Sequence, residues 1–252
     1  ETGDNREISI HPHKDDKSMN DWNGLMIAAL AKGAQVVDEP RYASAARRAT
    51  DFILKNVRTS QGLLLHRYRE GEAALTAHVD DYAFLIYGLL ELYESTFDVR
   101  YLETALKYND VLAGSFIDDD KGGYFMTSEN AEALIVRPKE LYDGAIPSGN
   151  SVPMLNLLKL ARLTGVPELE LQATETGKAF SGSIDRSPSG FAQALTALQF
   201  AHGETVEIVV VGKKDDPETK AMLAHINTVY KPGKVLLFKD AENAGKLAEL
   251  AP

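Results

Sequence analysis

The strongest constraint on the fold is a repeated alternation between two kinds of helix-forming segment. Residues 22–37 (WNGLMIAALAKGAQVV) are apolar on nearly every face, which is typical of a buried helix. Residues 42–57 (YASAARRATDFILKNV) instead carry apolar side chains three and four positions apart, with charged residues between them. That spacing predicts an amphipathic outer helix. A short β-hairpin is expected next, within residues 62–74.

The same order recurs along the chain. Further buried helices are expected at 81–95, 148–163 and 189–201, and further amphipathic partners at 100–116 and 169–180. Residues 122–137 (GGYFMTSENAEALIVR) are interpreted as a strand, a loop and a strand. Asp21 aligns with Asp80 when the first two cycles are superimposed, a period of roughly 60 residues.

This repeat predicts a mainly α fold. A unit of one buried and one amphipathic helix cannot cover its own apolar face, so successive units must stack against each other. Buried helices flanked by amphipathic ones predict two concentric layers, that is, a curved array or a closed toroid. A linear solenoid also fits the period, but it predicts more symmetric helix pairs.

The pattern changes after Gly203. Apolar strands are expected at 206–212 and 234–239, with a helix between them at 217–230. A short helix is expected after them at 243–250. We therefore expect a helical-hairpin portion over 1–203 and a small α/β (βαβ) element over 204–252. The first strand–helix turn, GKKDDPET, has one glycine and two acids and is not a phosphate-binding loop.

Charge and cysteine content exclude several classes of function. Lys+Arg 27 against Asp+Glu 37 gives a net charge of −10, which argues against nucleic-acid or anionic-membrane partners. No apolar run approaches the roughly 18–20 residues of a membrane helix. The chain has no cysteine, so thiol chemistry and thiolate metal sites are excluded. No targeting signal is visible and no Met opens the chain, so we expect a cytoplasmic protein cut from a longer one.

Polar motifs stand where three of the buried helices begin: DWNG at 21–24, HVDDY at 78–82 and DGAIPSGNS at 143–151. If the inner helices run in the same direction, these motifs converge at one end of a central cavity. Helix N-termini present free N–H groups and a partial positive charge, which suit acidic and polar side chains. Capping alone explains each motif separately, whereas their common position favours a shared cleft.

The second motif supplies the catalytic candidates. Asp80 and Asp81 are adjacent, so one carboxylate can cap the helix while the other faces the cavity, and each perturbs the pKa of the other. The substrate-binding candidates are aromatic rings that stack on a sugar and polar groups that bond its hydroxyls: Trp22, Tyr82, Asn23, Asp143, Ser148 and Asn150. Core packing for the rings and capping for the polar groups are the alternatives.

Other polar residues give weaker signals. His11 and His13 with the acids that follow suggest a metal site, but no third ligand is evident, and we expect neither a metal nor a cofactor. Four cationic residues either reach the same mouth or are simply solvated: Arg67, Arg69, Arg137 and Lys139. No serine-hydrolase elbow, Walker loop, zincin motif or dinucleotide fingerprint is present.

The segments HPHKDDKSMNDWNGLMIAALAKG, HVDDYAFLIYGLLELYE, GGYFMTS and DGAIPSGNSVPMLNLLKL resemble the YyaL-like family, which includes spermatogenesis-associated protein 20. The resemblance runs from about 11 to 162 and, more loosely, through VEIVVVG. It implies an N-terminal thioredoxin-like domain followed by a toroid of the (α/α)6 six-hairpin glycosidase type. This chain resembles the C-terminal half only, so the toroid is expected to be partial.

The resemblance also implies a function. Toroids of this type are similar to those of N-acylglucosamine 2-epimerases, cellobiose epimerases and six-hairpin glycosidases, which implies a carbohydrate-type cleft with a small sugar ligand. The alternative is a non-catalytic scaffold that serves the thioredoxin-like domain missing here, and a third possibility is a purely structural repeat. A partial toroid exposes apolar inner surface, so we expect contact with the rest of the longer protein or self-association.

Overall fold

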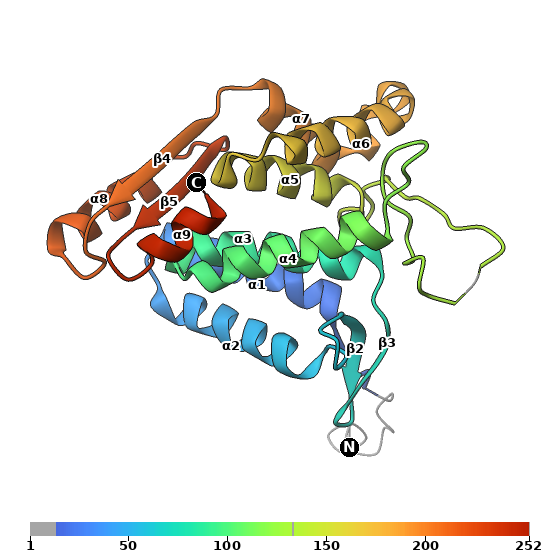
Figure 1. Cartoon of the computed structure of the whole chain (residues 1–252), viewed down its shortest axis with the longest axis horizontal. Coiled ribbons are helices and arrows are strands. Elements are labelled where there is room, and N and C mark those ends of the chain that lie inside the picture. The colour runs from blue at the N-terminus through green and yellow to red at the C-terminus, as the bar shows by residue number, and fades with distance from the viewer. Residues whose placement is uncertain (1–13, 133, 252) are drawn as a thin grey trace, which may run out of the picture.

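The computed structural model describes residues 14–132 and 134–251; His11 and His13 lie outside the described residues. An inner layer and an outer layer of helices form a curved array (Figure 1). The inner helices are α1 (Asn20–Val37), α3 (Val79–Thr96), α5 (Ser151–Thr164) and α7 (Ala192–His202). The outer helices are α2 (Pro40–Asn56), α4 (Val99–Ser115) and α6 (Pro167–Arg186), and a short 3-10 turn, η1 (Pro188–Gly190), precedes α7. The expected alternation of buried and amphipathic helices is therefore confirmed.

Helix α3 lies at the centre of the core. It contacts α1, α2, α4, α5 and the C-terminal strand pair, and nearly all its residues are buried. Its sequence, VDDYAFLIYGLLELYEST, is apolar on every side because every side meets another element. By contrast α2 buries only Ala46, Thr50 and Ile53, which are spaced three and four residues apart along one stripe.

The inner helices run in the same direction. The N–H of Asp21 donates to Asp81 Oδ1 where α1 and α3 begin, and Lys32 pairs with Glu91 near their C-terminal ends. Lys159, in the second half of α5, reaches the same Glu91. The N-terminal ends of the inner helices therefore lie together, and so do their C-terminal ends. The polar motifs come together at one end of the array, as the repeat predicted.

Close backbone contact sets the spacing of α1 and α3. A Cβ added at Gly24 would lie 2.5 Å from the carbonyl carbon of Phe84, and one added at Gly88 would lie 2.7 Å from the Gly24 oxygen. Both separations are too short for real atoms, so any side chain at either position would force the helices apart. The glycine of the DWNG motif is therefore a packing residue.

Local signals define the ends of the outer helices. Pro40 opens α2 behind Glu39, whose carboxylate accepts the N–H of Arg41 at 3.1 Å. Asp98 caps α4 in the same way through the N–H of Arg100. These caps lie on the outside, away from the shared end of the inner helices.

An antiparallel sheet forms beside the start of α1. Its strands are β1 (Ser18–Met19), β2 (Leu65–Arg69) and β3 (Glu72–Thr76), in the order β1-β2-β3. The hairpin expected within 62–74 is therefore present. The described residues between 122 and 137 form no strand, only isolated bridges at Tyr124 and Thr127. The amide of Asn150 bonds both the N–H and the C=O of Tyr124, so a side chain stands where a neighbouring strand would pair on that edge.

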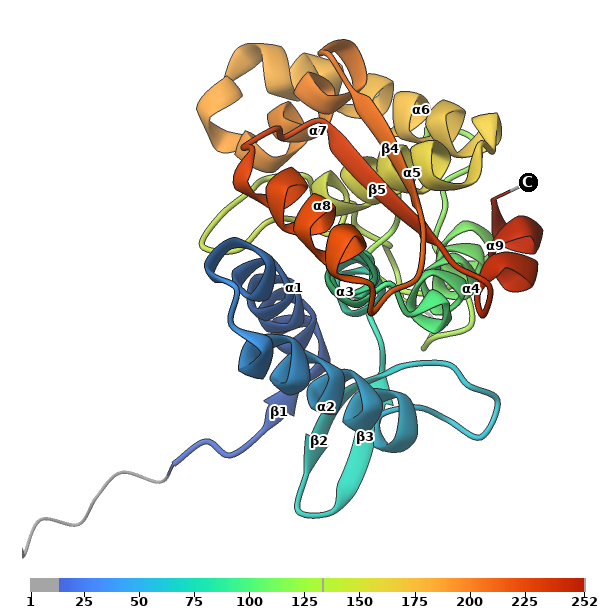
Figure 2. The same ribbon diagram turned by 90° about the vertical axis from the view of Figure 1, so that its left-hand side faces the viewer.

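The C-terminal part is the expected βαβ element. It consists of β4 (Val206–Val211), α8 (Pro217–Thr228) and β5 (Lys234–Lys239), followed by α9 (Ala244–Leu250). The two strands pair in parallel, from Val206 opposite Lys234 to Val211 opposite Lys239. This element lies across one end of the helical array, with α8 near α1, β5 on α3 and α5, and α9 against α4 (Figure 2). The domain boundary at 203/204 stays a prediction.

Within residues 14–132 and 134–251, no helix combines the length and the apolar character that crossing a membrane requires.

Candidate active site

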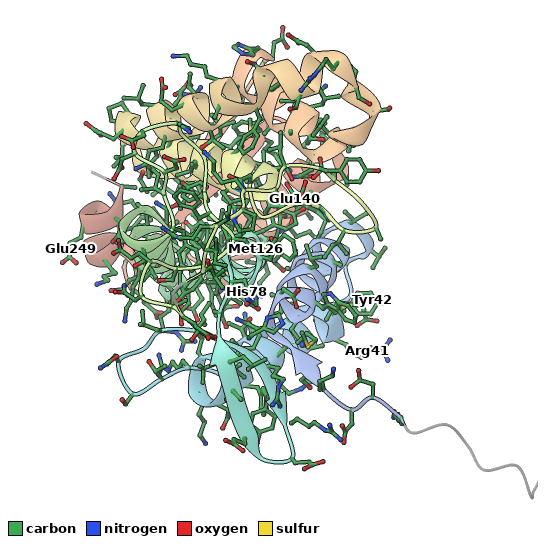
Figure 3. The ribbon with its side chains drawn as sticks, turned by 90° about the vertical axis from the view of Figure 1, so that its right-hand side faces the viewer. Arg41, Tyr42, His78, Met126, Glu140 and Glu249 are labelled. Atoms are coloured by element: carbon green, nitrogen blue, oxygen red, sulfur yellow. The ribbon has the colours of Figure 1, made fainter. Side chains whose placement is uncertain are left out.

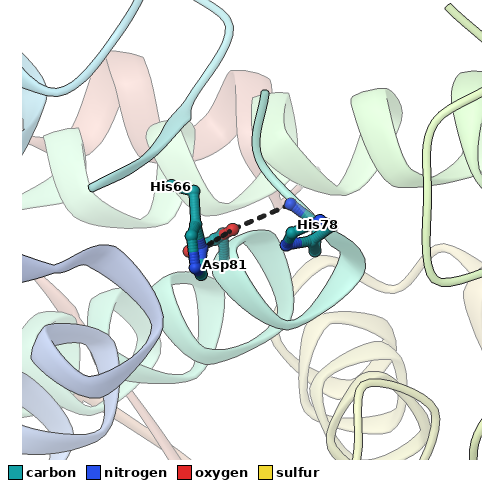
Figure 4. A group of neighbouring side chains, drawn as sticks. All are labelled: His66, His78 and Asp81. Atoms are coloured by element: carbon teal, nitrogen blue, oxygen red, sulfur yellow. Dashed lines mark hydrogen bonds and ion pairs between the residues drawn. The ribbon is translucent and has the colours of Figure 1, made fainter. Parts of the chain in front are cut away.

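Asp81 ties together the elements at the entrance of the array. Its side chain is fully buried and accepts the N–H of Asp21 at 3.1 Å and that of His78 at 2.8 Å. The Nδ1 atom of His66 lies 2.9 Å from its Oδ2 (Figure 4). One carboxylate therefore joins the beginning of α1, the beginning of α3 and the strand β2. Since these donors occupy both its oxygens, Asp81 is a positioning group.

Asp80 differs from its neighbour. Its Oδ1 atom is buried and accepts no side-chain hydrogen bond among the described residues, and the backbone of Gly149, which lies against it, lowers the pKa of Asp80 only in part. Burial, followed by repulsion from Asp81 and Asp21, raises the pKa of Asp80 to about 6. A carboxyl group with this pKa exchanges its proton near neutral pH, which suits an acid–base catalyst.

His66 completes the cluster and was not among the sequence candidates. Its hydrogen bond to Asp81 is the main cause of a raised pKa, which favours the charged imidazolium. The ring of His78 lies edge-on to it, with 4.9 Å between ring centres. His66 is the second residue of β2, and only the register of that strand turns its side chain toward α3. No motif in the sequence carries this information.

A small cavity of about 300 Å³ opens beside Asp80. Met126, Glu140 and Tyr142 line it together with the loop 144–149. His78, Met126 and Glu140 follow one another along this side of the molecule (Figure 3), and the N–H of Val79 donates to the Met126 carbonyl. Glu140 and the exposed Tyr142 ring are further polar and aromatic groups that the sequence analysis did not select.

The third entrance holds the loop that frames this cavity. Asp143 Oδ1 accepts the N–H of Ser148 at 2.9 Å, and its Oδ2 accepts the N–H of Gln193 at the start of α7 at 2.8 Å. Ser148 is buried and its hydroxyl bonds that of Ser151 at 3.0 Å. Asn150 is 1% exposed and bonds only backbone groups. In this structure these polar groups order the loop and the helix starts.

The remaining candidates separate into two environments. Trp22 is 62% exposed at the start of α1, where its ring is free to stack on a ligand, and the amide of Asn23 donates to the Met19 carbonyl. Tyr82 points into the core, where its ring packs against Tyr108 and its hydroxyl accepts a backbone N–H. Its ring has no free face, so this placement does not fit the expected stacking role.

The entrance also contains a group of potential metal ligands. Ligand atoms of His66, His78 and Asp81 all lie within 4.8 Å of one another. Two backbone N–H groups already hold Asp81, and the third donor is His66 itself. This arrangement favours a hydrogen bond from His66 to Asp81 over coordination of a divalent ion.

Three of the four cationic candidates are engaged elsewhere. The Arg137 guanidinium donates to the Thr127 carbonyl, and Lys139 pairs with Asp118 at 2.6 Å. Arg69 pairs with Asp16. These contacts secure loops and the hairpin, and they leave the carboxylates at the entrance without an arginine or lysine partner from this set.

Solved structures show which class of fold this is. The chain superimposes on a family 76 α-mannanase of Bacteroides thetaiotaomicron with a TM-score of 0.61 and 17% identity, over 86% of this chain and 57% of that one. For cellobiose 2-epimerase of Bacillus thermoamylovorans the TM-score is 0.59 at 15% identity, over 86% and 62%. The fold is the (α/α)6 toroid of such glycosidases and epimerases, present here in part.

Sequence relatives narrow the class further. The chain is 32% identical to human spermatogenesis-associated protein 20 over 96% of its own length, and 29% identical over 84% to an uncharacterised protein of Caenorhabditis elegans. No family model matches the sequence. The chain is therefore a relative of spermatogenesis-associated protein 20. It spans about a third of the length of these relatives.

Proposed function

We propose that this chain is part of a sugar-active toroid, epimerase- or glycosidase-like, with Asp80 as its acid–base group. One observation carries the proposal: a carboxyl group with a pKa of about 6, one of whose oxygens is buried without a side-chain partner, lies beside a cavity at the end of the array where the inner helices begin. The fold, shared with carbohydrate epimerases and glycosidases, supports the substrate class.

The surrounding groups fit this chemistry. Asp80 in its protonated form donates to a sugar oxygen, and in its ionised form it accepts a proton from a hydroxyl group or a ring carbon. The His66 imidazolium, held by Asp81, supplies a second exchangeable proton close by. Glu140 in the cavity lining offers an acceptor to the hydroxyls of a sugar, and Trp22, which lies outside that lining at the start of α1, offers an exposed ring to its apolar face.

The experiment compares the chain with Asp80→Asn and a matched control, Asp110→Asn, which changes an exposed carboxylate on α4. Each is incubated with mannose, N-acetylglucosamine, cellobiose and α-mannobiose, and products are detected by NMR. We expect turnover of at least one sugar, reduced by about 100-fold or more in Asp80→Asn and unchanged in the control. Turnover that survives Asp80→Asn refutes the role of Asp80, and no turnover of any sugar argues against the enzyme.

An exposed apolar stripe supports the second candidate, a scaffold module. Trp22, Met26 and Val36 are 62%, 57% and 67% exposed along one side of α1. Side chains of this size are seldom left in water together unless something covers them. In this case Trp22→Ala with Met26→Ala weakens binding of a thioredoxin-like domain supplied in trans, whereas sugars produce no thermal shift.

A further inference from the structure

A second and larger cavity, of about 710 Å³, lies at the opposite end of the array. Residues of α1, α3, α5 and α7 form one wall, and the segment 227–234 that joins α8 to β5 forms the other. Glu91 in its wall stands eleven residues after Asp80 on α3, which corresponds to about 16 Å along a helix. The volume is that of a site for a small molecule.

The charges around this cavity are mostly positive. Its lining contains four lysines and two glutamates, although the chain as a whole has 27 basic and 37 acidic residues. Glu91 is 2% exposed and pairs with both Lys159 at 2.5 Å and Lys32 at 2.6 Å. The single carboxylate of Glu91 therefore pairs with the ammonium groups of both Lys32 and Lys159. This group of three side chains carries one positive charge in excess.

A third ammonium group strengthens that excess. Lys234 at the start of β5 donates to the Ile226 carbonyl at 2.9 Å. Burial, followed by the positive charge of Lys32, lowers the pKa of Lys234. Glu94 lies near these lysines but does not line the cavity, and burial is the largest cause of a raised pKa for its carboxyl group.

Uncharged polar groups stand beside these lysines. The Nε2 atom of Gln35 is buried and has no hydrogen-bond partner among the described residues. Gln35, Tyr87, Thr196 and Gln199 all line the cavity, as do the buried side chains of Leu155 and Phe200. A ligand in this space meets ammonium groups at one point and hydroxyl and amide groups around them.

We propose that this cavity binds a small hydroxylated carboxylate, with its carboxylate between Lys32 and Lys234 and its hydroxyl groups on Gln35 and Tyr87. The excess cation selects an anion, and the orphaned amide of Gln35 selects an acceptor such as a sugar hydroxyl. The site is separate from the entrance and does not depend on catalysis there.

Titration calorimetry on the 252-residue chain tests the proposal with D-glucuronate, which carries a carboxylate where D-glucose carries a hydroxymethyl group. We expect saturable binding of D-glucuronate and at least tenfold weaker binding of D-glucose. Lys32→Gln and Lys234→Gln should each weaken D-glucuronate by about tenfold, or about 1.4 kcal/mol. Lys178→Gln, which removes an exposed lysine on α6, should leave it unchanged. Thermal melts of the variants verify folding; Lys32 is half exposed, so its loss opens no buried cavity.

Several results would overturn the proposal. These are an absence of D-glucuronate binding, equal binding of D-glucose or acetate, or equal effects of Lys32→Gln and Lys178→Gln. If Asp80→Asn abolishes D-glucuronate binding and the lysine variants do not, the ligand sits at the entrance and this second site is wrong, while the proposed function stands. If Asp80→Asn has no effect on turnover but the lysine variants no longer bind D-glucuronate, the second site stands and the proposed role of Asp80 is wrong.

Discussion

The two ends of the inner helices bury charge in opposite ways. At the entrance, Asp80, Asp81 and Asp21 lie around His66, and one buried oxygen of Asp80 has no side-chain partner. At the other end, one carboxylate, Glu91, lies between two lysines. Burial acts on both carboxyl groups, but it raises the pKa of Asp80, whereas the lysines outweigh it and lower the pKa of Glu91.

This difference separates proton exchange from fixed charge. The entrance holds a group that changes its protonation state near neutral pH, as acid–base chemistry requires. At the far end, pairing lowers the pKa of Glu91 and raises that of Lys159, so both groups of this pair favour their charged forms. Helices α1, α3 and α5 therefore provide both environments. Variants at each end should respond differently to loss of charge and to pH.

The largest effect is expected at the far end. Glu91→Ala leaves Lys159 buried without its counter-ion, and we expect a loss of about 3–5 kcal/mol in the free energy of unfolding, measured by urea denaturation. Glu103→Ala, which breaks an exposed pair with Lys246, is the control and should cost less than about 1 kcal/mol. Equal losses in the two variants would show that the far end holds no special charge arrangement.

At the entrance, Asp81→Ala leaves two buried N–H groups and His66 without their acceptor. We expect a loss of about 3 kcal/mol in the free energy of unfolding. Asp98→Ala removes another helix-capping carboxylate, one on the surface at α4, and should cost about 1 kcal/mol. A loss no greater than that of Asp98→Ala would mean that Asp81 is only an ordinary cap.

Asp80→Asn should raise the free energy of unfolding at neutral pH, whereas the two preceding variants lower it. The folded pKa of about 6 exceeds the ordinary value of 3.8, so the folded state binds this proton more tightly than the unfolded state does. Wild-type stability therefore falls as pH rises from about 4 to about 6, and the penalty reaches up to about 3 kcal/mol above that window.

The measurement is urea denaturation from pH 3.5 to 8. Asp80→Asn should be more stable than the wild type at pH 7.5, and the two should converge near pH 4. Asp110→Asn, on the surface, should follow the wild-type curve. An Asp80→Asn curve parallel to the wild type at every pH would remove the contrast in proton exchange between the two ends.

The smallest change in stability is expected at Gly24, where the backbones of α1 and α3 are in close contact. Gly24→Ala places a methyl group on the backbone of α3, and we expect a loss of about 1–3 kcal/mol in thermal or urea unfolding. Gly114→Ala in α4 meets nothing within 4 Å and should instead gain about 0.5–1 kcal/mol. A gain in both variants would show that α1 and α3 separate easily.

Much of the fold could be predicted because its signals are local. The apolar faces of the inner helices and the stripes of the outer ones depend on spacing within one segment, and the βαβ element follows from two apolar runs around a helix. The convergence of the entrances followed from helix direction alone. The strands expected over 122–137 are absent from its described residues, and at Tyr124 one edge of the backbone bonds the side chain of Asn150, more than ten residues away, instead of a neighbouring strand.

The candidate site was harder to predict because its chemistry depends on which partner each side chain meets. Asp80 and Asp81 are identical residues in adjacent positions, yet one is fully bonded and the other is not. His66 reaches the cluster through strand register, and Tyr82 turns into the core to meet Tyr108. From the sequence, Trp22 could equally be a core residue, but in the structure its side chain is exposed.

The bond between Asp81 and the backbone of Asp21 has a consequence for folding order. Met19 precedes α1 but makes no side-chain cap, so the first turn of α1 takes an acceptor from a residue sixty positions later in the chain. During synthesis α1 therefore emerges with a frayed beginning, and that turn closes only when α3 arrives beside it. Completion of the first helix and formation of the entrance are then a single event.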